Sequence, residues 1–245
     1  AAAVVEHPPP VAENGGVVGH CPEREQDRAA LPLLGRKKLF PVAGKPLLLW
    51  QVERLKENGI TDIIMVIGHL GDKIKEYFGD GEKFGVAIRY YEETEPLGTA
   101  GSFYYLKDMI HGERFVMMSG DLFFDIDFQR MIRFHEEKGA VATLFVHPNG
   151  HPFDSDLLVL DKDDKITAFD SKHNVRDYWY KNCVNAGIFV FEKKICDYVP
   201  EPVKRNLEND VIKGMLEAGE LIYGYCSPEY VKDVGTVDRV NQTLA

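Results

Sequence analysis

The sequence predicts an α/β fold in which helices cover both faces of a mostly parallel mixed sheet. Two observations predict it. From Leu39 onward, short apolar runs of strand length alternate with amphipathic helical segments at the spacing of βαβ units. The apolar runs also show little polar alternation, which is typical of strands buried on both faces.

The elements follow in order from their caps and their periodicity. The segment 45–59 begins a helix at Pro46, places Leu48, Leu49 and Val52 on one face and stops at Gly59. Similar patterns predict helices over 72–81, 99–112, 127–139, 206–219 and 236–245. Strands are predicted over 61–68, 86–93, 114–121, 140–147, 184–192 and 221–226, with a hairpin over 157–170.

The first part of the chain differs from the rest. Residues 1–35 form an atypical N-terminal segment that mixes small residues, prolines and clustered charges without a period of either kind. We expect irregular structure there, apart from a short strand at Val17-Val18. A single domain is expected over residues 36–245, with no internal repeat.

The composition predicts a soluble cytoplasmic protein. A formal net charge of -10 argues against a nucleic-acid or anionic-membrane surface, although a small phosphorylated ligand needs only a few local cations. The four cysteines show no CxxC pair and no metal-ligand spacing, so reduced thiols are expected. No apolar run approaches the roughly 20 residues of a membrane helix, and no basic region of a signal peptide is present.

The stretch FVMMSGDLFFDID ends a buried strand and at once presents acid. Asp121 lies at the carboxyl end of that strand, where doubly wound sheets bind ligands, and Gly120 lets the backbone approach a ligand closely. A carboxylate there suits Mg²⁺, which takes one or two protein carboxylates besides water and phosphate oxygens. The alternative is that Asp121 caps the following turn. Asp125 and Asp127 are interpreted as local, with Asp127 as the N-cap of the next helix.

A second carboxylate lies far along the chain. Asp233 precedes the tight turn Val234-Gly235-Thr236, which leads into the last predicted helix. Two distant carboxylates at loop positions could share one Mg²⁺. Periodicity does not show that they meet.

Several motifs, taken in order, resemble the sugar-phosphate nucleotidylyltransferases. They run from about Arg36 to the C-terminus and include YEETEPLGTAGS, SGDLFFDIDF, VNAGIFVFE and VKDVGTVDRV. The stretch VHPNGHPFDSDLLVLD most resembles the heptose 1-phosphate guanylyltransferase branch, which is close to the mannose-1-phosphate guanylyltransferases. The resemblance implies a Rossmann-like nucleotide-diphospho-sugar transferase fold. It also implies transfer of a nucleoside monophosphate from a nucleoside triphosphate, with GTP favoured, to a heptose or mannose 1-phosphate, releasing pyrophosphate.

The resemblance also implies the roles of two lysines. Lys37 matches a lysine near the triphosphate, although the surrounding prolines of the family motif are replaced here by Arg36 and Lys38. Lys172 matches a lysine for the sugar phosphate, in a motif altered to Ser171-Lys172-His173.

The remaining site residues implied by the resemblance fall into two groups. Asp121 and Asp233 would hold Mg²⁺, the expected cofactor. The residues that match the substrate-contacting loop and strand of the family are Gly98, Thr99, Asn185 and Gly187.

The glycine-rich phosphate loop with which the family opens is not recognisable. The equivalent region is VVGHCPEREQDRAALPLLGRKK, where Arg24 and Arg28 are candidates for the missing arginine. Three explanations are open: a divergent working loop, an altered reading frame of the gene upstream of about residue 35, or lost catalysis. The abrupt start of the resemblance favours the second. The third would make the chain a nucleotide-sugar-binding regulatory or scaffold domain.

Aromatic residues flank Lys172 on its C-terminal side. Tyr178, Trp179 and Tyr180 could line a sugar pocket. Exposed aromatics also mark contacts between subunits, so a homo-oligomer is the alternative interpretation.

Overall fold

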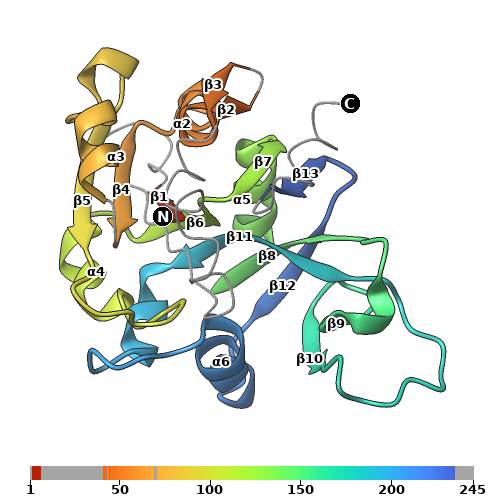
Figure 1. Cartoon of the computed structure of the whole chain (residues 1–245). Coiled ribbons are helices and arrows are strands. Elements are labelled where there is room, and N and C mark those ends of the chain that lie inside the picture. The colour runs from red at the N-terminus through yellow and green to blue at the C-terminus, as the bar shows by residue number, and fades with distance from the viewer. Residues whose placement is uncertain (1, 7–40, 43, 69–70, 235–245) are drawn as a thin grey trace, which may run out of the picture.

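A central mixed sheet organises the computed structural model, which describes residues 2–6, 41–42, 44–68 and 71–234. The sheet has the strand order β1 (Ala2–Glu6), β6 (Arg114–Ser119), β11 (Val184–Glu192), β8 (Ala142–His147) and β12 (Ile222–Cys226). The parallel pair β4 (Asp62–Ile67) and β5 (Ala87–Glu92) lies beside β1 and extends the layer (Figure 1). The predicted strands are therefore present within a residue or two of the expected bounds.

The strands of this sheet do not all run in one direction. β8 and β12 are parallel, whereas β11 is antiparallel to both β6 and β8. β1 is antiparallel to β6. The prediction of a mixed α/β sheet is confirmed, but β11 and β1 run against β6, β8 and β12. Residues 2–6, which the sequence pattern left irregular, form β1, whereas Val17-Val18 lies outside the described residues.

Three small two-stranded sheets accompany the central one. They are β2 (Pro41–Val42) with β3 (Lys45–Pro46), β7 (Leu122–Asp125) with β13 (Tyr230–Asp233), and β9 (Leu157–Leu160) with β10 (Ile166–Asp170). The pair β9–β10 is the predicted hairpin, and it turns at Asp164, whose φ is 66°. The pair β7–β13 was not predicted, because its two short strands come from distant parts of the chain and neither alternates clearly.

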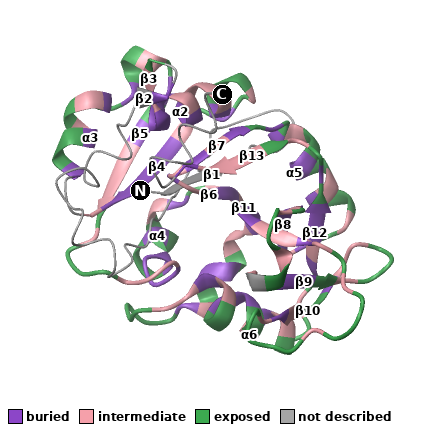
Figure 2. Cartoon of the chain, turned by 45° about the vertical axis from the view of Figure 1, so that its right-hand side comes forward, coloured by how far each residue is buried: buried purple, intermediate pink, exposed green. Residues whose placement is uncertain are grey.

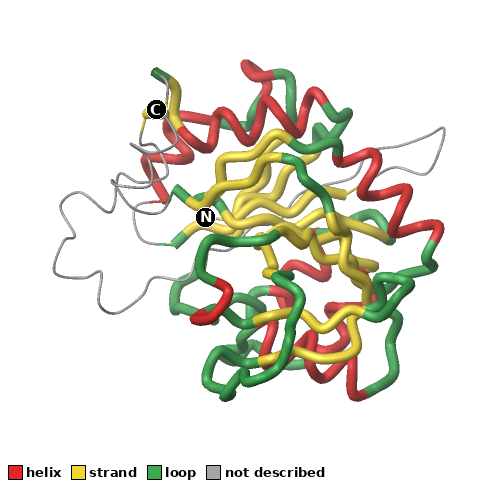
Figure 3. The backbone as a smooth tube through the Cα atoms, turned by 90° about the vertical axis from the view of Figure 1, so that its right-hand side faces the viewer, coloured by secondary structure: helices red, strands yellow, loops and turns green. Residues whose placement is uncertain are grey.

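The helices lie above and below the sheet (Figure 3). The α-helices are α2 (Leu47–Glu57), α3 (Gly71–Phe78), α4 (Phe103–Met109), α5 (Phe128–Glu137) and α6 (Lys213–Glu217). Short 3₁₀ segments are η3 (Glu82–Phe84), η4 (Pro152–Asp154) and η5 (Lys193–Tyr198), and the π-helical turn η6 (Leu207–Ile212) leads directly into α6. Asp127 caps α5 by accepting a hydrogen bond from the Arg130 N–H at 2.9 Å, as predicted. The helix predicted over 236–245 lies outside the described residues.

The core lies on both sides of the sheet. Figure 2 shows long buried stretches along its strands, and the four consecutive residues 115–118 of β6 are each 3% exposed or less. Burial of successive residues means that both faces of the strand are covered, since neighbouring side chains point to opposite faces. Within the described residues, the helices are too short or too polar to cross a membrane.

Candidate active site

The two predicted metal ligands meet at one end of the β7–β13 ladder. Asp121 lies in the turn between β6 and β7, and Asp233 is the last residue of β13. The antiparallel register pairs Asp233 with Leu122, and the Val234 N–H donates to the Asp121 carbonyl at 2.9 Å. Both aspartates are half-buried. The strands β7 and β13 lie side by side (Figure 1), and their ladder thus brings together two acids that are far apart in the sequence.

A buried glutamine braces the turn that carries Asp121. Gln51, only 2% exposed on α2, donates from Nε2 to the Ser119 carbonyl at 3.1 Å and to the Leu122 carbonyl at 2.7 Å. These bonds satisfy buried backbone acceptors on both sides of the turn and fix its path. Gln51 was not predicted as a site residue from the sequence. Its signal was a polar residue on the otherwise apolar face of the predicted helix.

A small apolar cluster supports the other acid. Val234, which follows Asp233, is buried together with Val42 and Leu47, and Trp50 and Phe123 pack against these three. The Trp50 indole N–H donates to the Val42 carbonyl at 2.7 Å. The cluster therefore links α2 and β2 to the end of β13, so that the position of Asp233 depends on apolar packing as well as on the ladder.

The acid pair has the donor chemistry of a magnesium site. Carboxylate oxygens are hard donors, and Mg²⁺ is held by one or two carboxylates together with water and substrate phosphates rather than by an all-protein cage. Within the described ranges, no group of three or more His, Cys, Asp or Glu side chains could hold a metal ion. Asp121 and Asp233 would therefore hold the ion together with a phosphorylated substrate. The role of Asp121 and Asp233 as metal ligands stays a prediction.

The Gly98–Thr99 loop docks onto the start of η6. The Thr99 hydroxyl accepts a hydrogen bond from the Leu207 N–H at 2.7 Å, and Gly98 forms an isolated bridge with Arg205. Gly98 has a φ of +77°, and a Cβ at this position would lie 2.3 Å from the Arg205 carbonyl oxygen. Only glycine fits this close approach of two backbones.

The Asn185–Gly187 segment of β11 also contacts the start of η6. The Asn185 Oδ1 accepts from the Gly187 N–H at 3.0 Å, while its Nδ2 donates to Glu208 Oε1 at 2.6 Å. Gly187 lies where the register of β11 against β8 shifts and has a φ of +77°. A Cβ there would be 3.2 Å from the Ser119 hydroxyl. Gly187 therefore joins the substrate-side residues to the turn that carries Asp121.

Lys172 lies in an exposed loop that follows β10. Its own backbone N–H donates to Asp156 Oδ1 at 2.8 Å. The loop is anchored by a buried ion pair, in which Arg176 Nε lies 2.8 Å from Asp170 Oδ2 and the two side chains are 5% and 9% exposed. Arg176 also donates to the carbonyls of Pro152 and Ser155, which ties the loop to η4.

The charge of Asp170 is well stabilised. Burial pushes the pKa of its carboxyl upward, but hydrogen bonds from Asn174, Tyr178 and Arg176, together with the charge of Arg176, hold that pKa below its usual range. The Tyr178 hydroxyl donates to Asp170 at 2.8 Å, so it is committed to the anchor of the loop. The neighbouring Trp179 is 85% exposed.

Glu208 is a second residue that sequence analysis missed. Burial raises the pKa of its carboxyl, the hydrogen bond from Asn185 opposes the shift, and the negative charge of Asp156 raises it further. Asp156 also accepts from the Lys172 N–H, so Glu208 is bonded to the Asn185 strand and is influenced electrostatically by an acid that holds the Lys172 loop. Its signal was an acidic residue in the first turn of a predicted helix, but that position is typical of ordinary helix stabilisation.

Lys37, Arg24 and Arg28 lie outside the described residues. Six of the predicted residues lie around β7, β11 and η6, and the backbone of Lys172 is bonded to Asp156.

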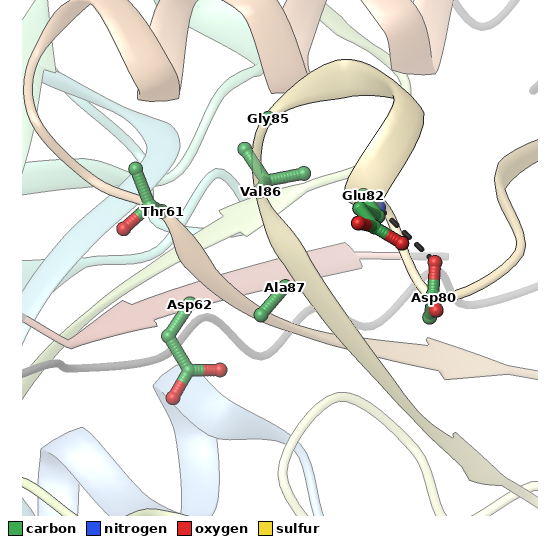
Figure 4. A pocket seen from close by; sticks show the side chains of 7 residues that line it. All are labelled: Thr61, Asp62, Asp80, Glu82, Gly85, Val86 and Ala87. Atoms are coloured by element: carbon green, nitrogen blue, oxygen red, sulfur yellow. Dashed lines mark hydrogen bonds between the residues drawn. The ribbon is translucent and has the colours of Figure 1, made fainter.

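A separate hollow lies at the start of β4 and β5. It is lined by Thr61, Asp62, Asp80, Glu82, Gly85, Val86 and Ala87 (Figure 4). Asp62 is paired there with Arg89 at 3.0 Å, and Asp80 accepts from the Glu82 N–H at 3.1 Å. None of the predicted site residues lines this hollow, and two of its acids, Asp62 and Asp80, have local partners.

Comparison with known proteins identifies the family. The model of a family described as nucleotidyl transferase matches residues 31–243. The chain belongs to this family. The resemblance seen in the motifs is confirmed, and the acid pair and the substrate-side residues all lie within the matched range.

Curated nucleotidyl transferases match over most of this chain. It is 28% identical over 221 residues to a UTP–glucose-1-phosphate uridylyltransferase of Synechocystis sp., covering 85% of this chain and 57% of that protein. It is 29% identical over 207 residues to a mannose-1-phosphate guanylyltransferase of Mycobacterium tuberculosis, covering 84% and 57%. The chain thus spans somewhat more than half the length of these relatives.

Solved structures share the fold. HddC from Yersinia pseudotuberculosis, in complex with GMP-PN, superposes with a TM-score of 0.71 at 19% identity, covering 85% of this chain and 88% of that one. A putative glucose-1-phosphate thymidylyltransferase from Bacillus anthracis gives a TM-score of 0.71 at 21% identity, covering 85% of each chain. At these identities the likeness establishes the nucleotidyl transferase fold and nothing finer.

Proposed function

We propose that this chain transfers a nucleoside monophosphate from a nucleoside triphosphate to a sugar 1-phosphate and releases pyrophosphate. The observation that carries the proposal is the meeting of Asp121 and Asp233 at the end of the β7–β13 ladder, next to Gly187. A half-buried acid pair beside a glycine-lined segment suits a metal-bound phosphate chain. GTP and a heptose or mannose 1-phosphate are the favoured substrates, supported by the motif resemblance.

The reaction needs charge neutralisation and alignment more than covalent catalysis. Both substrates are anions, and the sugar phosphate oxygen must attack the α-phosphorus in line with the leaving pyrophosphate. Mg²⁺ held by Asp121 and Asp233 would neutralise phosphate charge at this point. In the proposal, Lys37 faces the triphosphate and Lys172 the sugar phosphate, and no side chain acts as a nucleophile.

The remaining residues position the substrates. Gly98 and Thr99 line the base and sugar side, and Asn185 and Gly187 the sugar side. Residues 36–245 form the catalytic domain in this proposal, and residues 2–6 of the atypical segment 1–35 supply strand β1 to its sheet. A cytoplasmic location is supported by the free thiols of Cys183, Cys196 and Cys226, because such thiols persist in reducing compartments.

The test is pyrophosphate release by the purified chain with Mg²⁺. Four nucleoside triphosphates are combined with mannose, heptose and glucose 1-phosphates, and each combination is repeated with EDTA. We expect release with GTP and a mannose or heptose phosphate, and none after metal removal. Absence of release in every combination, from a chain shown to be folded by circular dichroism, would overturn the proposal and favour a regulatory or scaffold domain.

A further inference from the structure

The Asn185 side chain is already committed within the protein. Its Oδ1 accepts from the Gly187 N–H, and its Nδ2 donates to Glu208 Oε1 at 2.6 Å. An amide offers an oxygen with two lone pairs and two N–H donors, so half of the hydrogen-bonding capacity of Asn185 is already used within the protein. Asn185 is therefore better suited to orient Glu208 than to recognise a substrate by itself.

The carboxyl group of Glu208, in contrast, makes fewer hydrogen bonds within the described part of the chain than the Asn185 side chain. Among the residues that the structure describes, Asn185 is the one hydrogen-bond partner of its carboxyl group. The residue is partly buried, and its backbone lies next to Leu207, whose N–H is held by the Thr99 hydroxyl. The carboxyl group is thus fixed at one oxygen and flanked by the Gly98–Thr99 loop and the start of β11.

We propose that Glu208 is the carboxylate that binds hydroxyl groups of the sugar. The inference rests on the proposed function and assigns the sugar subsite to the space between the Gly98–Thr99 loop, Asn185 and Glu208. A carboxylate accepts hydrogen bonds from two neighbouring hydroxyls, and sugars present such pairs. Asn185 acts as the positioning residue that holds Glu208 in place.

The local charge favours a hydroxyl-rich group over a phosphate at this point. The negative charge of Asp156 acts on the carboxyl of Glu208 and raises its pKa, so both acids contribute negative charge here. An anion placed there would be repelled, whereas a neutral group with several O–H donors would be attracted.

The test compares Glu208→Gln with the matched control Glu217→Gln. Glutamine keeps an oxygen that accepts from Asn185, so the variant preserves the internal bond and removes only the charge and one acceptor. Glu217 is an exposed glutamate in α6, the same helical segment. Because hydrogen bonds to charged groups are the stronger ones, we expect Glu208→Gln to raise the KM for the sugar 1-phosphate about 10- to 100-fold. The KM for the nucleoside triphosphate should change less than about twofold.

Deoxy sugars separate binding from a structural role. With wild-type protein, replacing the contacted hydroxyl by hydrogen should raise the KM by a similar factor. In Glu208→Gln the same deoxy sugar should cause little further loss, because the contact is already gone. Losses that multiply at every hydroxyl position, or an unchanged KM for the sugar phosphate in Glu208→Gln, would overturn the assignment.

A calorimetric titration with GDP-mannose gives a readout that does not depend on turnover. If wild-type protein binds GDP-mannose but releases no pyrophosphate, the proposed catalysis fails while the subsite is still tested. Weaker binding by Glu208→Gln, with Glu217→Gln unchanged, then supports the assignment. Equal binding by Glu208→Gln and wild type overturns it, and absence of binding by wild type overturns both proposals.

Discussion

The two halves of the candidate site are held together in different ways. Asp121 and Asp233 are positioned by backbone pairing in the β7–β13 ladder and by a buried apolar cluster behind it. On the substrate side, Asn185 and Glu208 are positioned by a side-chain hydrogen bond, and Lys172 by a loop that a buried ion pair anchors.

This difference determines how substitutions in each half affect stability and activity. A backbone ladder is nearly independent of side-chain identity, so the aspartates can be changed without moving the chain. Side-chain bonds disappear with the residue that makes them, and their loss leaves buried groups unsatisfied. Substitutions in the acid pair should therefore alter activity alone, whereas substitutions on the substrate side should alter stability and activity together.

The largest effect is expected at the acid pair. Asp121→Asn and Asp233→Asn should each lower kcat by at least about a hundredfold, because loss of a carboxylate weakens metal-assisted charge neutralisation. Their urea unfolding midpoints should stay near that of wild type. The control Asp125→Asn removes an exposed carboxylate from the other end of β7 and should keep full activity. Full activity in Asp121→Asn or Asp233→Asn would remove that residue from the metal site.

The next effect is expected at the anchor of the Lys172 loop. Arg176→Met leaves the buried charge of Asp170 without its ion-pair partner, which should cost about 3–5 kcal/mol of unfolding free energy. Urea denaturation measures this loss. Arg133→Met, a change at an exposed arginine of α5, should stay within about 0.5 kcal/mol of wild type. If the two variants are equally stable, the ion pair does not hold the loop.

A smaller effect is expected where the two halves meet. Gly187→Ala places a Cβ at positive φ and 3.2 Å from the Ser119 hydroxyl, so we expect a loss of about 1–3 kcal/mol together with reduced activity. Gly214→Ala is the matched control, since Gly214 lies in α6 and a Cβ there meets no atom within 4 Å. Alanine should stabilise that helix by about 0.5–1 kcal/mol. If Gly187→Ala changes neither stability nor activity, the backbone around residue 187 can adjust to the added Cβ.

The smallest effect concerns pH and a network outside both halves. His135 is fully buried and bonded to Thr143 and to Glu192, and burial lowers its pKa although the Glu192 carboxylate, which accepts a hydrogen bond from the ring, opposes this shift. The unfolded chain binds a proton near pH 6.5, so it takes up the proton before the folded protein does. Stability is therefore complete above about pH 6.5 and falls below it, by at most about 1.4 kcal/mol per pH unit for this group.

Urea midpoints at pH 7.5 and 5.5 measure the pH effect in wild type and in His135→Gln. The variant should show the weaker pH dependence. Some dependence should remain, because burial also lowers the pKa of His147. If the two proteins show the same pH dependence, groups other than His135 cause it. The measurement also separates loss of fold from any direct effect of pH on either half of the site.

The sequence by itself determined the family, the order of the elements and the residues at the ends of the strands. Periodicity and caps are local properties, so α2, α5, the β9–β10 hairpin and β11 could be predicted from the residues within them. Asp121 was visible because an acid stands out where an apolar run ends, whereas Gly98 and Gly187 were implied by the resemblance to the family.

Only the tertiary structure decided which of these residues meet. The pairing of Asp121 with Asp233 depends on two short strands that are far apart in the sequence, and no local pattern encodes their register. Gln51 and Glu208 looked like ordinary helix residues until packing placed one under the Ser119–Leu122 turn and the other beside Asn185. Contacts between distant segments are set by the packing of the whole core, and a sequence pattern reports only on its own neighbourhood.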